Sequence, residues 1–188
     1  MKKFPKIDKI TVWVCGVRPP GPSFGGWAWV TENQYASGAE SRKTDTTENK
    51  MRLMAILDAV YTLREKYHEI EVVVPSRILV KEIGRYGRWW RDPYYPRRQD
   101  REPAVFPQLF VPLFLAEEHT KITFLSVEQN EVDENIERAR NIALAEMVTE
   151  RALHLDRGWF KKPNDEQNMV SLSWANHKDG RLLAPLRL

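Results

Sequence analysis

The spacing of hydrophobic residues changes several times along the chain, and each change predicts a different secondary structure. Apolar and polar residues alternate over 9–17, and a tryptophan-bearing apolar run covers 25–30, so both segments predict β-strands. A more polar strand is expected at about 35–43. The segment 18–23 between the first two strands is rich in proline and glycine, which predicts a turn. The chain is therefore expected to begin with three antiparallel strands.

Helical and strand patterns alternate after these strands. Thr46 or Thr47 is expected to cap a helix that continues toward Tyr67, because a threonine hydroxyl can accept a bond from a first-turn N–H. The later elements are expected to be a strand at 70–74, a helix at about 76–84, a short helix at 107–118, a strand at 122–127 and an amphipathic helix at 133–152. Pro112 argues against an unbroken helix at 107–118.

The remaining segments complete the domain prediction. Residues 85–106 are arginine-rich, aromatic and expected to be irregular. The order of elements predicts a mixed α/β domain over residues 1–152. Residues 153–188 are expected to form a C-terminal extension, either a tail or a small hairpin.

Composition narrows the classes of function. The chain has 188 residues, a formal net charge of +3, four histidines and one cysteine. A single cysteine, Cys15, excludes an internal disulfide and is typical of a reducing compartment, so a cytoplasmic location is expected. So few cysteines and histidines argue against a structural zinc site. No apolar run approaches the roughly 20 residues that span a bilayer, so no membrane partner is expected.

Five short motifs occur in an order that resembles the type 1 ribonuclease H family. They are Gly21-Pro22 followed by Gly25-Gly26-Trp27-Ala28, Thr46 to Ala55, Val73-Val74-Pro75-Ser76, His119 to Val127, and Asn135 to Ala143. The resemblance covers roughly residues 9–150. It implies a ribonuclease H-like fold: a mixed five-stranded sheet, three antiparallel strands and then two parallel ones, flanked by helices.

The resemblance also implies a site in which four carboxylates hold two divalent metal ions that hydrolyse a phosphodiester. The four corresponding positions here are Cys15, Arg52, Pro75 and Arg140, and none is acidic. Magnesium needs oxygen ligands, which these side chains do not supply. We therefore expect no metal ion, no cofactor and no catalytic residue. The chain is predicted to be a degenerate family member that is not an enzyme.

A relocated metal site is the first alternative. Glu48 lies one helical turn before Arg52, and other acids lie near the lost positions: Asp45, Glu131, Asp133, Glu134 and Glu137. If these acids replace the missing metal ligands, the chain is expected to be an active metal-dependent nuclease. The competing interpretation is that they cap helices and remain solvated.

Arginine and tryptophan side chains supply the candidate binding residues. Six arginines and two acids lie between Arg85 and Arg101. The family has a basic, tryptophan-bearing protrusion at this place that grips the DNA strand of an RNA–DNA hybrid. The predicted nucleic-acid-binding residues are Arg52, Arg85, Arg88, Trp89, Trp90, Arg91, Arg97, Arg98 and Arg140. Arg52 and Arg140 could instead form ion pairs with Glu48 or Glu137. Tryptophan and arginine are also enriched at protein–protein hot spots, so a protein partner is the competing interpretation.

Together these features predict a catalytically inactive module with a ribonuclease H-like fold. The module is expected to bind RNA–DNA hybrid, RNA or DNA, or to act as a scaffold in a larger complex. By analogy, that complex contains a reverse transcriptase or belongs to a mobile element or phage. The alternatives are the nuclease with a relocated site and a subunit that only binds other proteins.

Overall fold

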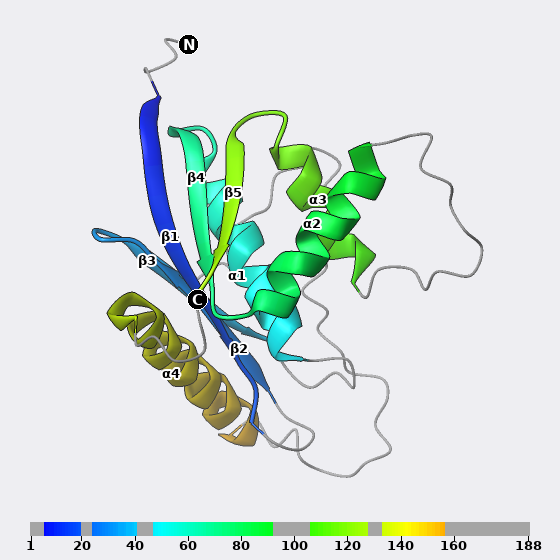
Figure 1. The fold of residues 1–188 in the computed structure, drawn as a ribbon. Helices are drawn as coiled ribbons and strands as arrows, with labels where there is room; N and C mark the ends of the chain where they lie inside the picture. Colours follow the sequence, from blue (N-terminus) through cyan, green and yellow to red (C-terminus); the bar gives the residue numbers. More distant parts are fainter. Residues whose placement is uncertain (1–5, 20–23, 41–46, 92–105, 128–132, 157–188) are drawn as a thin grey trace, which may run out of the picture.

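The computed structural model describes residues 6–19, 24–40, 47–91, 106–127 and 133–156 (Figure 1). Its elements are β1 (Ile7–Val17), β2 (Gly25–Val30), β3 (Tyr35–Glu40), α1 (Glu48–Leu63), β4 (Tyr67–Val74), α2 (Arg77–Arg91), α3 (Pro107–Ala116), β5 (Lys121–Ser126) and α4 (Glu134–Asp156). The predicted helices and strands occur in the predicted order.

The five strands form one mixed sheet in the order β3-β2-β1-β4-β5. β1 and β3 each pair with β2 in the antiparallel direction, whereas β4 pairs in parallel with β1 and β5. Trp13 of β1 lies opposite Val30 of β2 and Val73 of β4, which fixes the register at the sheet centre. This topology confirms the expected fold class.

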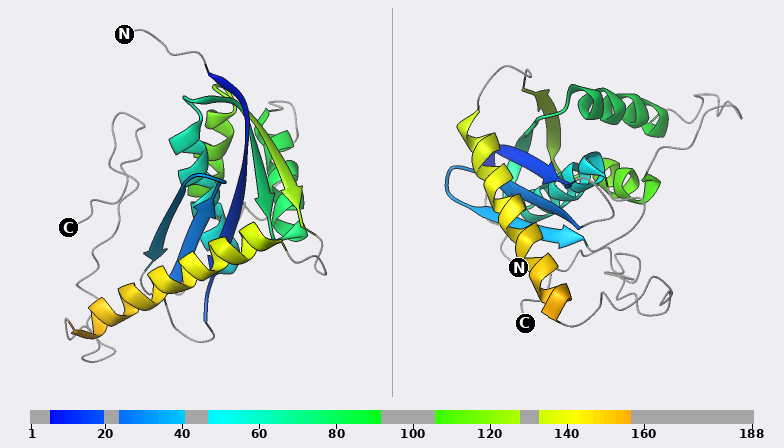
Figure 2. Two further views of the ribbon diagram at one scale, coloured as in Figure 1. Left: turned by 90° about the vertical axis from the view of Figure 1, so that its left-hand side faces the viewer. Right: turned by 90° about the horizontal axis from the view of Figure 1, so that it is seen from below.

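Helices cover both faces of the sheet (Figure 2). α1, α2 and α3 lie on one face, and α4 crosses the other over β1, β2 and β3. Strand residues alternate between the faces, so Val12 and Val14 join the core under α1, whereas Cys15 and Val17 join the core under α4. The end of β1 is therefore enclosed between α1 and α4.

The start of α1 agrees with the capping prediction. Thr47 has an extended backbone conformation, and its hydroxyl accepts a hydrogen bond from the Lys50 amide at 3.1 Å. Lys50 is itself buried and pairs with Glu40 of β3 at 2.9 Å. These contacts fix the first turn of α1 against the sheet.

Several predicted boundaries differ from the structure. The helix expected to continue toward Tyr67 ends at Leu63, and Tyr67 begins β4. The helix expected at 76–84 continues to Arg91, so residues 85–91 are helical and not irregular. Packing on α3 supports this continuation, because the Tyr86 ring centroid lies 5.1 Å from that of Phe110 and Gly87 faces Phe114. α3 forms across Pro112, and the Tyr61 hydroxyl donates to the Pro112 carbonyl at 3.2 Å.

α4 continues to Asp156. The domain boundary after residue 152 stays a prediction, and residues 157–188 with their expected hairpin lie outside the described residues. None of the helices in the described ranges is long and apolar enough to cross a membrane.

Candidate nucleic-acid interface

The structure brings the four positions of the expected metal site together. Cys15 lies near the end of β1, and Pro75 follows the last residue of the adjacent parallel strand β4. Gly16 packs so tightly on α1 that a Cβ there would lie 2.5 Å from the Arg52 amide nitrogen. Arg140 follows Ala139, a residue of α4 in the same apolar cluster as Cys15.

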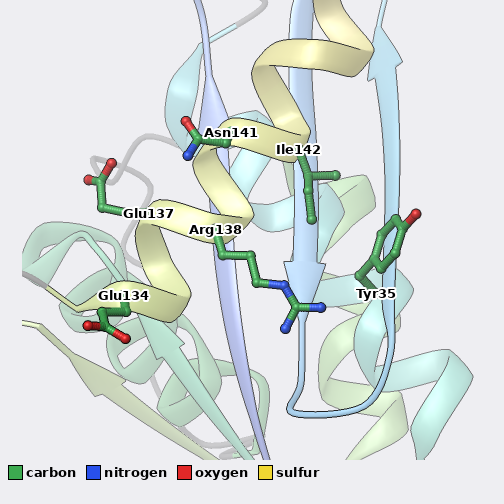
Figure 3. Close-up of a pocket in the computed structure, with 6 residues that line it drawn as sticks. All are labelled: Tyr35, Glu134, Glu137, Arg138, Asn141 and Ile142. Atoms are coloured by element: carbon green, nitrogen blue, oxygen red, sulfur yellow. The ribbon is translucent and has the colours of Figure 1, made fainter.

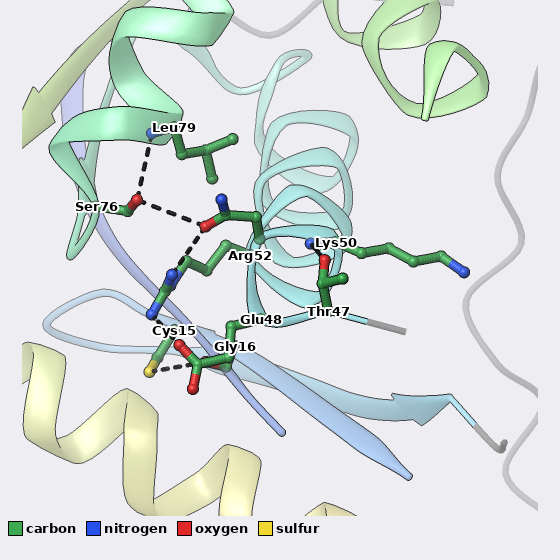
Figure 4. Close-up of polar contacts among 9 residues, drawn as sticks. Cys15, Gly16, Thr47, Glu48, Lys50, Arg52, Ser76 and Leu79 are labelled. Carbon is green, nitrogen blue, oxygen red and sulfur yellow. Dashed lines mark hydrogen bonds and ion pairs between the residues drawn. The ribbon is translucent and has the colours of Figure 1, made fainter. Parts of the chain in front are cut away.

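Arg52 is held in place by its own helix. One terminal nitrogen donates to Asn49 Oδ1 at 2.9 Å, and the other to Glu48 Oε2 at 2.8 Å (Figure 4). The Ser76 hydroxyl donates to Asn49 Oδ1 at 3.5 Å and accepts from the Leu79 amide at 3.2 Å. The start of α2 is thereby linked to α1 through the Asn49 amide group.

Arg140 is held more loosely. It forms an ion pair with Glu137, one turn earlier on α4, at 3.5 Å, and both side chains are more than half exposed. The interpretation that both arginines form ion pairs with Glu48 and Glu137 is therefore confirmed. These ion pairs do not test whether the arginines also bind nucleic acid.

Cys15 is buried, and the charges of both arginines act on its thiol. Burial raises the pKa of its thiol to about 11, although the positive charges of Arg52 and Arg140 act in the opposite direction. Glu48 and Glu137 raise the pKa further. The side chain is a neutral thiol at physiological pH.

The residues at these positions do not fit a pair of magnesium ions. The two guanidinium groups are cationic, the Cys15 thiol is protonated, and proline has no ligating side-chain atom. In the part of the chain that the structure describes, no group of three or more His, Cys, Asp or Glu side chains could hold a metal ion. These four positions therefore do not supply the ligands of a two-metal site.

The acids proposed for a relocated metal site differ from one another in their contacts. Asp133 caps α4 by accepting bonds from the Asn135 and Ile136 amides at 2.9 and 3.1 Å, and its other oxygen accepts from the Trp13 indole at 2.9 Å. Glu134 is exposed in the first turn of α4. Asp45 and Glu131 lie outside the described residues.

A cationic face on α2 begins beside this site. Three exposed basic residues of α2 recur at spacings of four: Arg77, Lys81 and Arg85. At 3.6 residues per turn and 1.5 Å per residue they fall within an arc of about 80°, over about 12 Å of helix. Arg88 and Arg91 follow at spacings of three along the same helix. Leu79 and Ile83 on the opposite face are buried. The expectation of an irregular loop concealed this spacing, so Arg77 and Lys81 were missed as candidates.

The other predicted binding residues are only partly described. Arg85 is exposed on α2, whereas nothing is described of the side chains of Arg88, Trp89, Trp90 and Arg91. Arg97 and Arg98 lie outside the described residues. The structure thus adds a helical framework for the first half of the arginine-rich segment.

A surface depression of about 570 Å³ lies on the outer side of α4 (Figure 3). Its lining residues are Tyr35, Glu134, Glu137, Arg138, Asn141 and Ile142. Arg138 extends toward the turn between β2 and β3 and donates to the Thr31 carbonyl at 3.3 Å. Arg138 and Arg140 thus make different contacts although they are two residues apart.

Several known proteins similar to this chain are named Ribonuclease H. No family model matches the chain. Ribonuclease H of Campylobacter jejuni subsp. jejuni is 30% identical over 85 residues, which are 45% of this chain and 58% of that protein. Ribonuclease H of Maricaulis maris is 27% identical over 139 residues, covering 73% of this chain and 92% of that protein.

Solved structures agree on the fold. RNase H1 from the archaeon Halobacterium salinarum superposes with a TM-score of 0.54 at 16% identity, over 75% of this chain and 98% of that chain. LC11-RNase H1 in complex with an RNA/DNA hybrid superposes with a TM-score of 0.55 at 16% identity, over 77% of this chain and 99% of that chain. The chain has a ribonuclease H-like fold.

The prediction that this ribonuclease H-like chain is not an enzyme is wrong. Its curated relatives, including those of C. jejuni and M. maris, are named as enzymes, Ribonuclease H or Ribonuclease HI. The chain spans about 58% of the length of the first of these relatives. Its own activity and substrate are therefore matters for proposal.

Proposed function

We propose that the ribonuclease H-like chain binds an RNA–DNA hybrid, with the cationic face of α2 along the phosphates of one strand. The observation that carries the proposal is the row of basic residues on α2, which begins next to the converged ends of β1 and β4. The names of the relatives and the hybrid-bound LC11-RNase H1 support the choice of substrate.

Charge spacing is the physical basis of this proposal. Arg77, Lys81 and Arg85 are exposed, and each is about one helical turn from the next. Cations arranged in this way can neutralise successive phosphates and release the counterions that those phosphates hold. Binding of this kind depends strongly on salt and weakly on base sequence. The aromatic residues Trp89 and Trp90 at the end of α2 are proposed to contact sugars or bases.

The test is hybrid affinity measured against salt concentration. Replacing Arg77, Lys81 or Arg85 with alanine should weaken binding and reduce the slope of log affinity against log salt by about 0.9 for each lost phosphate contact. Arg88→Ala and Arg97→Ala should act in the same direction. Lys66→Ala is the matched control, because Lys66 is exposed just before β4, at the strand end opposite to α2. Equal effects from Lys66→Ala and the α2 variants would contradict a specific binding face.

A second candidate function is metal-dependent hydrolysis of the hybrid with displaced carboxylates. The relatives' names favour it, and Glu48 and Glu137 offer half-exposed carboxylates beside two of the converged positions. Cleavage products from a hybrid incubated with Mg²⁺ or Mn²⁺, and their loss in Glu48→Gln, would support this candidate. If the purified wild type produces no cleavage products, the candidate fails.

Three further proposals go with the binding function. A protein partner, a setting in a reverse-transcriptase, mobile-element or phage complex, and a cytoplasmic location all stay predictions. Isolation of the chain with its native partners would test the first two. If the α2 variants leave hybrid affinity unchanged but release a co-purifying protein, the face binds protein and not nucleic acid.

A further inference from the structure

We infer that Arg52 and Arg140 hold a phosphate group of the bound nucleic acid directly, at the place where the family resemblance puts metal ions. This inference rests on the proposed hybrid binding and adds the chemistry of the site. Its main consequence is that hybrid binding needs no divalent cation.

Arg52 is oriented before any ligand arrives. Its side chain is only 15% exposed, and contacts to Asn49 and Glu48 fix both terminal nitrogens. Its Nε is buried and has no hydrogen-bond partner among the described residues. A buried donor without an acceptor is unfavourable, so the guanidinium group is incompletely paired in the unliganded chain.

Arg140 supplies a second charge from the other face of the sheet. Arg52 lies on α1 and Arg140 on α4, and both act on Cys15 at the end of β1. The Arg140 side chain is 57% exposed, so it can turn toward a ligand at small cost in desolvation. One fixed and one adjustable guanidinium group can approach the same phosphate from two sides.

The present partners of the arginines are weak competitors. Glu48 and Glu137 are 52% and 51% exposed, and each pairs with an arginine of its own helix. Ion pairs within a helix contribute little where water solvates the charges, and water reaches both carboxylates and the Arg140 guanidinium group. A phosphate forms stronger, bidentate bonds to guanidinium groups. Both glutamates can therefore turn into water when a phosphate binds.

Removal of Glu48 gives the sharpest test. Glu48→Gln takes away the competing negative charge, so it should raise hybrid affinity several-fold. Arg52→Gln and Arg140→Gln should each lower affinity about tenfold, which corresponds to about 1.4 kcal/mol. Arg138→Gln is the matched control, because it removes the same charge from the same helix but from the side that contacts Thr31.

The double variant Glu48→Gln/Arg52→Gln separates two explanations of a weak Arg52→Gln variant. If Arg52 binds the phosphate, the double variant should bind as weakly as Arg52→Gln alone. If Arg52 only masks the charge of Glu48, the double variant should bind like the wild type, and the inference is wrong. Circular dichroism of each variant identifies misfolding, and the exposed Arg140 provides a test that does not depend on the packing of Arg52.

The last measurement tests whether hybrid binding depends on divalent ions. Affinities in Mg²⁺ and in EDTA at matched ionic strength should agree within twofold. Binding that requires Mg²⁺, or arginine variants that bind like the wild type, would overturn the inference while leaving hybrid binding intact. Failure of the wild type to bind any hybrid would instead overturn the proposed function, and the inference with it.

Discussion

The two faces of the sheet are packed in different ways. The face under α1, α2 and α3 has a large core with fully buried side chains such as Trp29, Met51 and Leu57. The face under α4 has a small core that includes Cys15, Ala28, Ala139 and Ala143. Small residues allow α4 to approach closely: a Cβ on Gly26 would lie 2.1 Å from the Ala143 carbonyl oxygen.

This difference affects the proposed site, because its two arginines come from different faces. Arg52 belongs to the helix with the large core, and Arg140 to the helix held by close backbone approach. Burial of large side chains is the main favourable contribution to folding, so α1 should be the more stable support. We expect changes under α1 to affect mainly stability and changes under α4 to affect the site as well.

The largest effect should come from truncating a side chain in the large core. Leu53 of α1 is 1% exposed, so Leu53→Ala should lower the free energy of unfolding by about 3 kcal/mol through lost burial and an unfilled cavity. Met147→Ala under α4 should lower the free energy of unfolding less, because Met147 belongs to the small core and is 8% exposed. Urea denaturation followed by circular dichroism measures both. If Met147→Ala lowers the free energy of unfolding as much as Leu53→Ala or more, the two faces do not differ in this way.

The free energy of unfolding should fall by a smaller amount, about 2 kcal/mol, when a substitution prevents the close approach of α4. In Gly26→Ala the added methyl group would collide with the backbone of α4 and push the helix outward. Hybrid affinity should fall too, because Arg140 moves with the helix.

Gly84→Ala is the control for this substitution. Gly84 lies within α2, and a Cβ there would meet nothing within 4 Å, so alanine should stabilise the helix by up to about 1 kcal/mol. If thermal unfolding shows Gly26→Ala to be as harmless as Gly84→Ala, α4 is not held by close packing.

The cap of α4 should contribute less than its packing. Asp133→Ala removes two hydrogen bonds from the first-turn amides and one from the Trp13 indole. The free energy of unfolding, measured by thermal unfolding, should therefore fall by about 1 kcal/mol. Glu134→Ala, at the exposed neighbouring position, should change stability much less. Equal losses from the two variants would mean that Asp133 acts only through its charge near the helix start.

The last effect is absent at neutral pH and should emerge only at alkaline pH. Because burial raises the pKa of Cys15 from 9.0 to about 11, the thiol of the unfolded chain ionises first as the pH rises. The thiol's contribution to stability is therefore constant below about pH 9 and decreases between about pH 9 and 11. Unfolding curves of the wild type and Cys15→Ala should diverge only in that window. Rapid alkylation of folded Cys15 near neutral pH would contradict its burial.

The α/β class, the order of the elements and the Thr47 cap were predictable from the sequence. Each depends on contacts within a few residues, such as alternating apolar positions or a hydroxyl one turn before an amide. The mixed five-stranded sheet was predictable only through the resemblance, because strand pairing joins residues far apart in the chain. The four non-acidic positions could also be named in advance, because the motifs that contain them are short and local.

Tertiary structure decided what surrounds those positions. The sequence left ion pairing and phosphate contact open for Arg52 and Arg140, and only the folded helices placed Glu48 and Glu137 against them. It also suggested irregular structure after residue 84, where packing of α2 on α3 maintains the helix and aligns its basic residues. Local patterns depend only on residues close together in the chain, whereas a site built from β1, α1, β4 and α4 exists only after the sheet forms. The sequence by itself therefore determined which side chains are present, and the fold determined which of them meet.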